Sequence, residues 1–148
     1  MKEFLLETRL LLARPRDEVF PFFANAHNLE AITPPWLNFE VFTPGPIVMR
    51  PGTLIDYRIR IRGFQVRWRT KIAVWQPPYQ FVDEQLQGPY KLWHHTHRFE
   101  ERDGGTLCTD RVRYYPRGGA WVNWLFVRRD LEEIFGFRRQ RLLALFPA

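Results

Sequence analysis

The sequence predicts an α+β fold that forms a single domain over residues 1–148. From residue 37 to residue 115, short segments alternate apolar and polar residues, and Gly and Pro residues separate these segments as turns separate antiparallel strands. The last segment, 120–146, changes to the helical period. We therefore expect about seven antiparallel strands, two short helices after the first strand, and one long C-terminal helix.

The N-terminal part is expected to contain one strand and two short helices. Residues 3–13 form an apolar stretch that is long enough for a strand. Pro15 suits the first position of a helix, and the acidic Asp17 is favourable near the positive end of its dipole. A second short helical segment over 26–32 is expected to end before Pro34, because a proline disfavours the helical conformation of the residue before it.

The middle of the chain predicts a hairpin with one basic face. Segment 37–43 is expected to be a strand and 44–52 a loop, and the strands 53–62 and 64–75 then pair around a turn at Gly63. In this hairpin the apolar residues fall on one face, which indicates an antiparallel sheet that is covered on one side. The opposite face carries basic residues: Arg58, Arg60, Arg62, Arg67, Arg69 and Lys71.

Residues 81–99 are expected to form two antiparallel strands joined at residues 87–89. Because side chains alternate along a strand, every second residue shares a face. One face of the second strand carries Trp93, His95, His97 and Phe99. A hairpin turn at 103–105 is expected to lead into the strand 106–115, in which Asp110, Val112 and Tyr114 share a side.

Residues 120–146 are expected to form one helix of about 27 residues, on the order of 40 Å long. Its apolar residues fall in an arc of roughly 100° on a helical wheel. These residues are Trp124, Val127, Leu131, Ile134, Phe135, Leu142 and Leu145. Arg138 is the one charged residue in the same arc.

The composition bounds the class of protein. A chain of 148 residues with 45% hydrophobic residues is long enough to bury a core. No apolar run approaches the roughly 20 residues that cross a bilayer, and acidic residues interrupt the N-terminal apolar stretch, which argues against a secretory signal. A cytoplasmic location is therefore expected. Cys108 is the single cysteine, so no internal disulfide can form. We expect its side chain either on the face of its strand opposite to that of Asp110 or at the edge of the buried region.

The formal net charge of +6 could attract nucleic acid, anionic lipid or an acidic ligand. Acidic residues are interspersed with the basic ones, however, and the basic face of the hairpin lacks the exposed aromatic residues typical of nucleic-acid binding. Nucleic acid is therefore not expected as a partner, and weak contact with an anionic membrane remains open. The sequence makes no prediction of the oligomeric state.

Several short words in the sequence resemble a known family when they are taken in order. They are ARPRDEVF (13–20), NLEAITPPWL (28–37), GTLIDY (52–57), WRT (68–70), FVDEQ (81–85), GPY (88–90) and WHHTHRF (93–99). In this order the chain resembles the START/SRPBCC superfamily, and in particular its bacterial cyclase/dehydrase-like ligand-binding branch. The resemblance implies a helix-grip fold, in which a curved sheet wraps around the C-terminal helix and leaves a cavity between them. It implies no particular reaction, because carriers, receptors and enzymes share this fold.

The inner face of the predicted sheet mixes large aromatic residues with imidazoles and carboxylates. Such a mixture suits a cavity that holds an amphiphilic organic molecule, although at least half of these residues would also suit a plain core. The expected ligand-binding residues are Tyr57, Trp68, Asp83, Trp93, His95, His97, Phe99, Asp110, Tyr114, Leu131, Phe135 and Arg138.

Several roles remain open for the polar residues of this set. His95 and His97 could line the pocket or lie in a hydrogen-bonded core, transfer protons, or bind a metal if Asp83 or Asp110 supplied a further ligand. No metal and no other cofactor is expected. Arg138 either extends past the sheet edge with its charge in water, or points inward to pair with a carboxylate or an acidic ligand.

We expect a non-catalytic carrier or sensor that binds a hydrophobic or amphiphilic small molecule, either lipid-like or aromatic and polyketide-like. One alternative is an enzyme of the cyclase/dehydratase type, in which His95 or His97 acts as the acid–base group with help from Asp83 or Asp110. A second alternative is a protein- or membrane-docking module.

Overall fold

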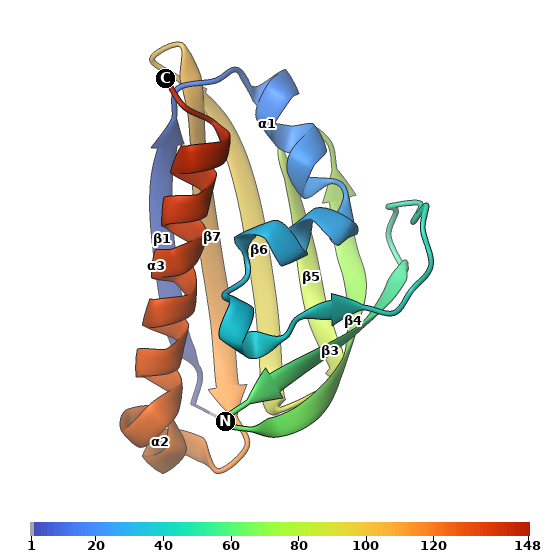
Figure 1. Ribbon diagram of the computed structural model, residues 1–148, viewed down its shortest axis with the longest axis vertical. Helices are drawn as coiled ribbons and strands as arrows, with labels where there is room; N and C mark the ends of the chain where they lie inside the picture. The colour runs from blue at the N-terminus through green and yellow to red at the C-terminus, as the bar shows by residue number, and fades with distance from the viewer. Residues whose placement is uncertain (1) are drawn as a thin grey trace.

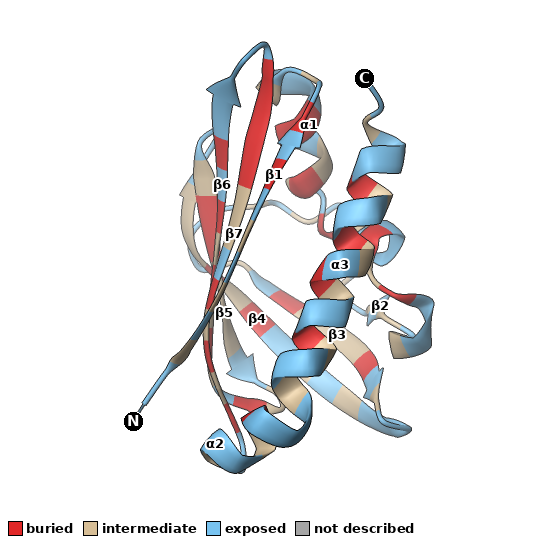
Figure 2. Ribbon diagram, turned by 90° about the vertical axis from the view of Figure 1, so that its left-hand side faces the viewer, coloured by how far each residue is buried: buried red, intermediate tan, exposed pale blue. Residues whose placement is uncertain are grey.

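The computed structural model describes residues 2–148 and shows a sheet that is covered on one face by helices (Figures 1 and 2). The strands are β1 (Phe4–Leu12), β2 (Glu40–Val41), β3 (Leu54–Ile61), β4 (Phe64–Gln76), β5 (Gln80–Gln87), β6 (Tyr90–Arg102) and β7 (Gly105–Pro116). The helical segments are α1 (Arg16–Phe23), η1 (Ala26–Ile32), η2 (Pro35–Leu37), α2 (Gly119–Val122), η3 (Asn123–Val127) and α3 (Arg128–Leu145). The predicted α+β class is confirmed.

Within residues 2–148 the strands form one seven-stranded antiparallel sheet in the order β1-β7-β6-β5-β4-β3-β2. The first strand pairs with the last, from Phe4 opposite Tyr114 to Leu12 opposite Thr106. Two register shifts between β4 and β5 interrupt the ladder, and such irregularities increase the local twist of a sheet. This order places β5, β6 and β7 side by side, so their inward side chains meet near the middle of the sheet.

The core lies between the sheet and the two longer helices, α1 and α3. Helix α1 buries three apolar residues, Val19, Phe20 and Phe23. Helix α3 buries residues spaced three or four apart, which lie on one side of a helix: Leu131, Phe135, Arg138 and Leu142. Figure 2 shows these buried positions on the side of α3 that faces the sheet. Most of the predicted apolar stripe therefore has the expected orientation.

The predicted long C-terminal helix is confirmed as a continuous helical region from Gly119 to Leu145, but Trp124 and Leu145 are not buried in it. Residues Asn123–Val127 form a π-helical segment between α2 and α3, which breaks the regular 100° step on which the helical wheel rests. Trp124 is consequently 77% exposed, whereas Asn123 is buried and accepts a hydrogen bond from the Tyr114 hydroxyl at 2.9 Å. Leu145 is the last residue of α3, one turn after the buried Leu142, and is also exposed.

The predicted strand over 37–43 is wrong in its extent, because only Glu40–Val41 pairs as a regular strand. Asn38 ends the short segment η2 in a left-handed conformation with φ 45°, so the extended backbone begins after it. Beyond β2, the Phe42 amide still donates to the Asp56 carbonyl at 2.8 Å. The contact between these segments thus continues without a regular ladder.

Substitution of Leu142 by alanine is expected to lower the free energy of unfolding by about 2–5 kcal/mol, because the side chain is 2% exposed and its removal leaves a cavity in the core. The neighbouring Leu143 is 45% exposed, and Leu143→Ala is expected to change this free energy by less than about 0.5 kcal/mol. Urea denaturation of both variants measures the difference. Equal losses would contradict the orientation of α3.

Candidate functional site

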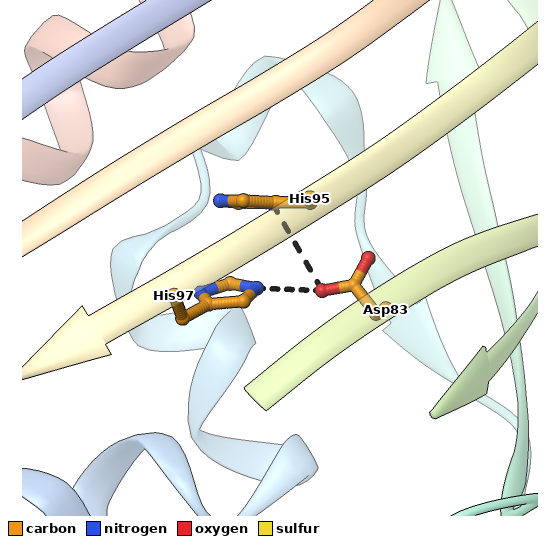
Figure 3. A group of neighbouring side chains, drawn as sticks. All are labelled: Asp83, His95 and His97. Atoms are coloured by element: carbon orange, nitrogen blue, oxygen red, sulfur yellow. Dashed lines mark hydrogen bonds and ion pairs between the residues drawn. The ribbon is translucent and has the colours of Figure 1, made fainter. Parts of the chain in front are cut away.

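Two histidines and two aspartates from three neighbouring strands form a buried hydrogen-bonded network on the inner face of the sheet. In the register of the strands, Asp83 on β5 lies opposite His95 on β6, and His97 lies opposite Asp110 on β7. The His97 Nε2 and Asp83 Oδ2 are hydrogen-bonded (Figure 3) at a distance of 2.6 Å, and the His95 Nε2 lies 2.8 Å from Asp110 Oδ1. Because an ionised carboxylate only accepts hydrogen bonds, each Nε2 carries the proton.

Helix α3 adds Arg138 to this network from the opposite layer. One terminal nitrogen of its guanidinium donates to Asp110 Oδ1 at 3.0 Å and lies 3.5 Å from the free Nδ1 of His97. The residue is 9% exposed, and its guanidinium lies over the rings of Phe23 and Phe135. Of the two orientations considered for Arg138, the structure has the inward one. The buried Nε of Arg138 has no hydrogen-bond partner within residues 2–148.

The network shifts the pKa values of the two aspartates downward. Burial by itself would raise the pKa of Asp110, but the charge of Arg138 and the hydrogen bond from His95 hold it well below its usual value, and His97 adds to this effect when its Nδ1 is protonated. Burial also acts to raise the pKa of Asp83, and its hydrogen bond with His97 and the nearby charges outweigh this effect. Both carboxylates are therefore ionised near neutral pH.

The two imidazoles are shifted in opposite directions. Burial acts to lower the pKa of His97, but hydrogen bonds with Asp110 and Asp83 outweigh it, and the net shift is upward. For His95, burial and the proximity of His97 prevail over the hydrogen bond to Asp110, and the pKa is lowered. On acidification from neutral pH the first proton therefore binds to His97, while His95 stays neutral.

Aromatic rings enclose the two imidazoles. The rings of His95 and His97 are stacked with centroids 3.7 Å apart, and Phe81 stacks on the other side of His97 at 4.1 Å. Phe135 of α3 meets His95 edge-on at 5.8 Å. The network is thus a polar layer inside an apolar interior, where its hydrogen bonds are poorly accessible to water.

The structure brings together seven of the twelve predicted ligand-binding residues around this network. They are Asp83, Trp93, His95, His97, Asp110, Phe135 and Arg138. Phe99 instead packs in the apolar cluster under α1. Tyr57 lies in a separate cluster at the β3 side of the sheet, with its ring 5.0 Å from that of Phe39.

The remaining three predicted residues lie at the end of the sheet near α2. Trp68 packs against Trp93 with ring centroids 5.2 Å apart. Tyr114 and Leu131 belong to the same apolar cluster as Trp93 and Phe135. These residues form a continuous apolar wall that begins at the network and runs toward the start of α3.

The sequence prediction missed Phe81 and Phe23, and it misplaced Cys108. Phe81 lies directly opposite His97. This pairing can be found from the sequence by counting residues in both directions from the turn at 87–89 along the two antiparallel strands. Phe23 comes from a helix that is distant in sequence, and no local pattern indicates its contact with Arg138. Cys108 lies two residues before Asp110, hence on the same face of β7, and is buried. Burial and the negative charge of Asp110 raise the pKa of its thiol to about 12.

Asp83, His95 and His97 offer three possible metal-ligating atoms within 4.8 Å of one another. Two atoms that bind one tetrahedral zinc ion at about 2.0–2.1 Å are separated by roughly 3.3 Å. The 2.6 Å separation between His97 Nε2 and Asp83 Oδ2 is instead that of a hydrogen bond. In this geometry His97 and Asp83 share a proton through that hydrogen bond.

Two surface pockets lie away from the network. One of about 390 Å³ is lined by Glu30, Asn38, Phe39, Glu40, Arg58, Ile59, Arg60 and Gln65. The other, of about 670 Å³, is lined by the loop before β3, within residues 43–54. Neither pocket includes a residue of the network, so the binding of a molecule beside the network remains a proposal.

The basic outer face of β3 and β4 is largely compensated by ion pairs. Arg69 contacts Asp56 at 2.8 Å, Arg62 contacts Asp130 at 2.9 Å, and Arg58 pairs with Glu40. The charge available on this face for an acidic partner is thereby reduced. Among the described residues, no helix has both the length and the apolar character that crossing a bilayer requires.

Comparisons with known proteins agree with this architecture. The family model for polyketide cyclase/dehydrase and lipid transport proteins matches residues 12–135. The ZhuI aromatase/cyclase from Streptomyces sp. R1128 superimposes with a TM-score of 0.75 at 15% identity, over 97% of this chain and 93% of that chain. A search of curated proteins gives no significant match.

Two further solved structures have the same fold. Protein CV1439 from Chromobacterium violaceum gives a TM-score of 0.77 at 11% identity and covers 97% of both chains. Ara h 8.0201 gives a TM-score of 0.66 at 16% identity, over 97% of this chain and 99% of that chain. At these identities the similarity shows the shared fold.

Substitution of Asp83 by asparagine is expected to lower the pKa of His97, because the imidazolium loses a charged hydrogen-bond partner while it stays buried. NMR titration of the histidine ring protons measures this shift. Asp103→Asn, in the exposed β6–β7 turn, is the matched control and should leave His97 unchanged. An unaltered His97 titration in Asp83→Asn would show that the carboxylate does not hold the proton.

Asp110→Asn is expected to lower the free energy of unfolding at neutral pH by about 3–5 kcal/mol, because Arg138 is left buried without a counter-charge. The pKa values of Asp83 and Asp110 are lowered by folding, so their stabilising effect is present above their unfolded pKa, about 3.9, and is lost as the pH falls through the folded values.

The upward shift of His97 has the opposite sign: its contribution is full below about pH 6.5 and is lost as the pH rises through the folded pKa. Asp110→Asn lacks one of the two carboxylates whose stabilising effect is lost in acid. Urea denaturation from neutral to acidic pH should therefore show a smaller loss of stability below about pH 4 in Asp110→Asn than in the parent chain. Parallel pH profiles for the two proteins would contradict this role of Asp110.

Proposed function

The chain belongs to the polyketide cyclase/dehydrase and lipid transport family, and from this premise we propose that it binds a hydrophobic or amphiphilic small molecule between its sheet and helix α3. The family match and the fold neighbours confirm the START/SRPBCC resemblance and the helix-grip fold. The bound molecule would lie beside the His–Asp–Arg network and along the apolar wall of Trp93 and Phe135. In this role the protein is a carrier or sensor.

The observation that supports this proposal best is the unpaired Nε of Arg138. This donor is buried, and no acceptor within residues 2–148 reaches it. An unpaired buried donor costs about 1–3 kcal/mol, and the acceptor atom of a ligand would remove that cost. The apolar body of the ligand would add about 25 cal/mol for each Å² that it buries.

The charges of the network favour an uncharged polar group on the ligand. With His97 neutral, the two carboxylates and the guanidinium sum to one negative charge, and protonation of His97 brings the sum to zero. A carboxylate on the ligand would have to compete with Asp110 for Arg138. We therefore infer a ligand with a carbonyl, phenol or hydroxyl oxygen, such as an aromatic ketone or a neutral lipid.

A second candidate function is catalysis of the cyclase/dehydratase type. Two features of His97 favour it: the 2.6 Å hydrogen bond to Asp83 and the raised pKa of the imidazole. Together they give His97 a proton that can be exchanged near neutral pH. His97 would donate this proton to a leaving hydroxyl group of the substrate, so that water departs as the C–O bond breaks. The imidazole, now neutral, would then take a proton from the adjacent carbon as the C=C bond forms. Asp83 would stabilise the imidazolium before the transfer, and His95 would remain a hydrogen-bonded spacer.

Binding can be measured with two neutral fluorescent probes of similar size. Prodan carries a ketone on a naphthalene ring, whereas N-phenyl-1-naphthylamine has no carbonyl group. Arg138→Leu is expected to weaken prodan binding about ten-fold, which corresponds to one hydrogen bond from a charged donor, and to leave the second probe unaffected. The matched control is Arg139→Leu, because Arg139 is exposed on the same helix.

Arg138→Leu alone leaves Asp110 buried without its ion-pair partner, which could itself disturb folding. The variant that combines Arg138→Leu with Asp110→Asn removes both charges of the pair and therefore separates a loss of binding from misfolding. It should show the same selective loss of prodan affinity. Equal affinities of the parent chain and Arg138→Leu for prodan would exclude the arginine anchor. Failure of both probes to bind, together with no co-purified compound in native mass spectrometry, would exclude the carrier function.

A further inference from the structure

The start of the C-terminal helical region exposes an unusual number of large apolar side chains. Trp121 is 69% exposed and Trp124 is 77% exposed, with ring centroids 6.4 Å apart. Leu125 and Phe126 beside them are also exposed. We call these four residues the tryptophan tip. Figures 1 and 2 place α2, where the tip begins, at one end of the molecule, and α3 extends away from this end.

Burial in this segment is the reverse of that in an ordinary amphipathic helix. Trp121, Trp124 and Leu125 are all exposed, and the two indole rings lie next to each other, so these residues form one outward surface. The residue that faces the interior is the polar Asn123, which is 6% exposed and bonded to Tyr114. A helix that only stabilised the fold would place its apolar residues inward. The outward indoles therefore indicate contact with an apolar partner.

Basic residues surround the tryptophan tip. Arg117 lies just before α2 and is exposed. Arg128 and Arg129 follow the tip, with 74% and 83% of their side chains exposed. Each of these two pairs weakly with a glutamate one turn further along α3, at 3.4 and 3.7 Å. The acidic partners thus follow the two arginines along the chain, and the charged residues nearest to the tip in sequence are basic.

The tip is held on the body of the protein. Arg62, in the turn between β3 and β4, pairs with Asp130 at 2.9 Å, and its guanidinium lies 4.5 Å from the centre of the Phe126 ring. Phe126 therefore attaches the tip to the rest of the protein, while the two tryptophans project beyond it. A fixed, projecting group of apolar residues can enter a soft partner without a change in the fold.

We propose that the tryptophan tip inserts into the interface of a membrane that contains anionic phospholipids. Tryptophan is enriched at the headgroup level of bilayers, where its ring contacts acyl chains and its N–H reaches polar groups. Arginines next to such residues contact lipid phosphates. The formal net charge of +6 adds a long-range attraction of the same sign. This docking does not depend on the small-molecule function proposed above.

Flotation with large vesicles tests the proposal directly. The parent chain is expected to float with vesicles of phosphatidylcholine and phosphatidylglycerol in equal parts, and far less with phosphatidylcholine alone. The double variant Trp121→Ala/Trp124→Ala should lower the partition coefficient at least ten-fold. Arg128→Gln/Arg129→Gln should weaken binding only to the anionic vesicles and reduce its dependence on salt.

Two control variants locate the effect on the tip. Trp36 is another exposed tryptophan, at 56%, and contacts Phe137, which is about 20 Å along the helix from Trp124. Trp36→Ala should leave vesicle binding unchanged. Arg60→Gln/Arg67→Gln, on the outer face of the sheet, removes the same number of charges from exposed residues outside the tip, so it should weaken binding to the anionic vesicles less than Arg128→Gln/Arg129→Gln does.

Three results would overturn the proposal. The first is a parent chain that does not float with anionic vesicles, and the second is an equal loss of binding in Trp36→Ala. The third is a dimer in sedimentation equilibrium that dissociates in Trp121→Ala/Trp124→Ala without any vesicle binding, which would identify the tip as an interface between two copies. Prodan binding by the same tip variant shows separately whether the small-molecule site is intact.

Discussion

The ion pair between Arg138 and Asp110 is the interaction on which the interior of this protein depends. It joins α3 to strand β7 of the sheet, and it supplies the positive charge that keeps Asp110 ionised inside an apolar interior. Asp110 in turn accepts from His95, whose ring stacks on His97, so the position of each imidazole depends on the same carboxylate. Without this pair the sheet would hold buried carboxylates with too little compensating charge.

A layer of charged groups is a costly way to fill the space between a helix and a sheet. Apolar clusters adjoin the network along the interior, with Phe81 on one side and Phe135 on the other. Aliphatic side chains at the positions of the network would serve stability at least as well, because buried ion pairs often contribute little or nothing to it. The presence of coupled, shifted titratable groups in such a place is instead typical of a site that binds or reacts. The network is therefore the part of the interior where the ligand that we propose would bind.

The C-terminal helical region has two different roles along its length. From Leu131 to Leu142 it closes the inner face of the sheet and delivers Arg138. At its start, the π-helical segment turns Asn123 inward and the indoles outward, so the same element carries a surface of a different kind. If both proposals hold, one helical region would link a bilayer surface to the interior in which the ligand lies.

The sequence by itself determined the class of the fold, the order of its elements, the faces of β5 and β6, and the face of β7 shared by Asp110, Val112 and Tyr114, because alternation along a strand is a local property. It therefore predicted that His95 and His97 point inward. Tertiary structure alone decided that Arg138 pairs with Asp110, that His97 bonds to Asp83, and that Trp124 faces outward. These outcomes depend on the register between strands, on the angle at which α3 crosses them and on the π-helical segment, none of which a residue's neighbours in sequence specify.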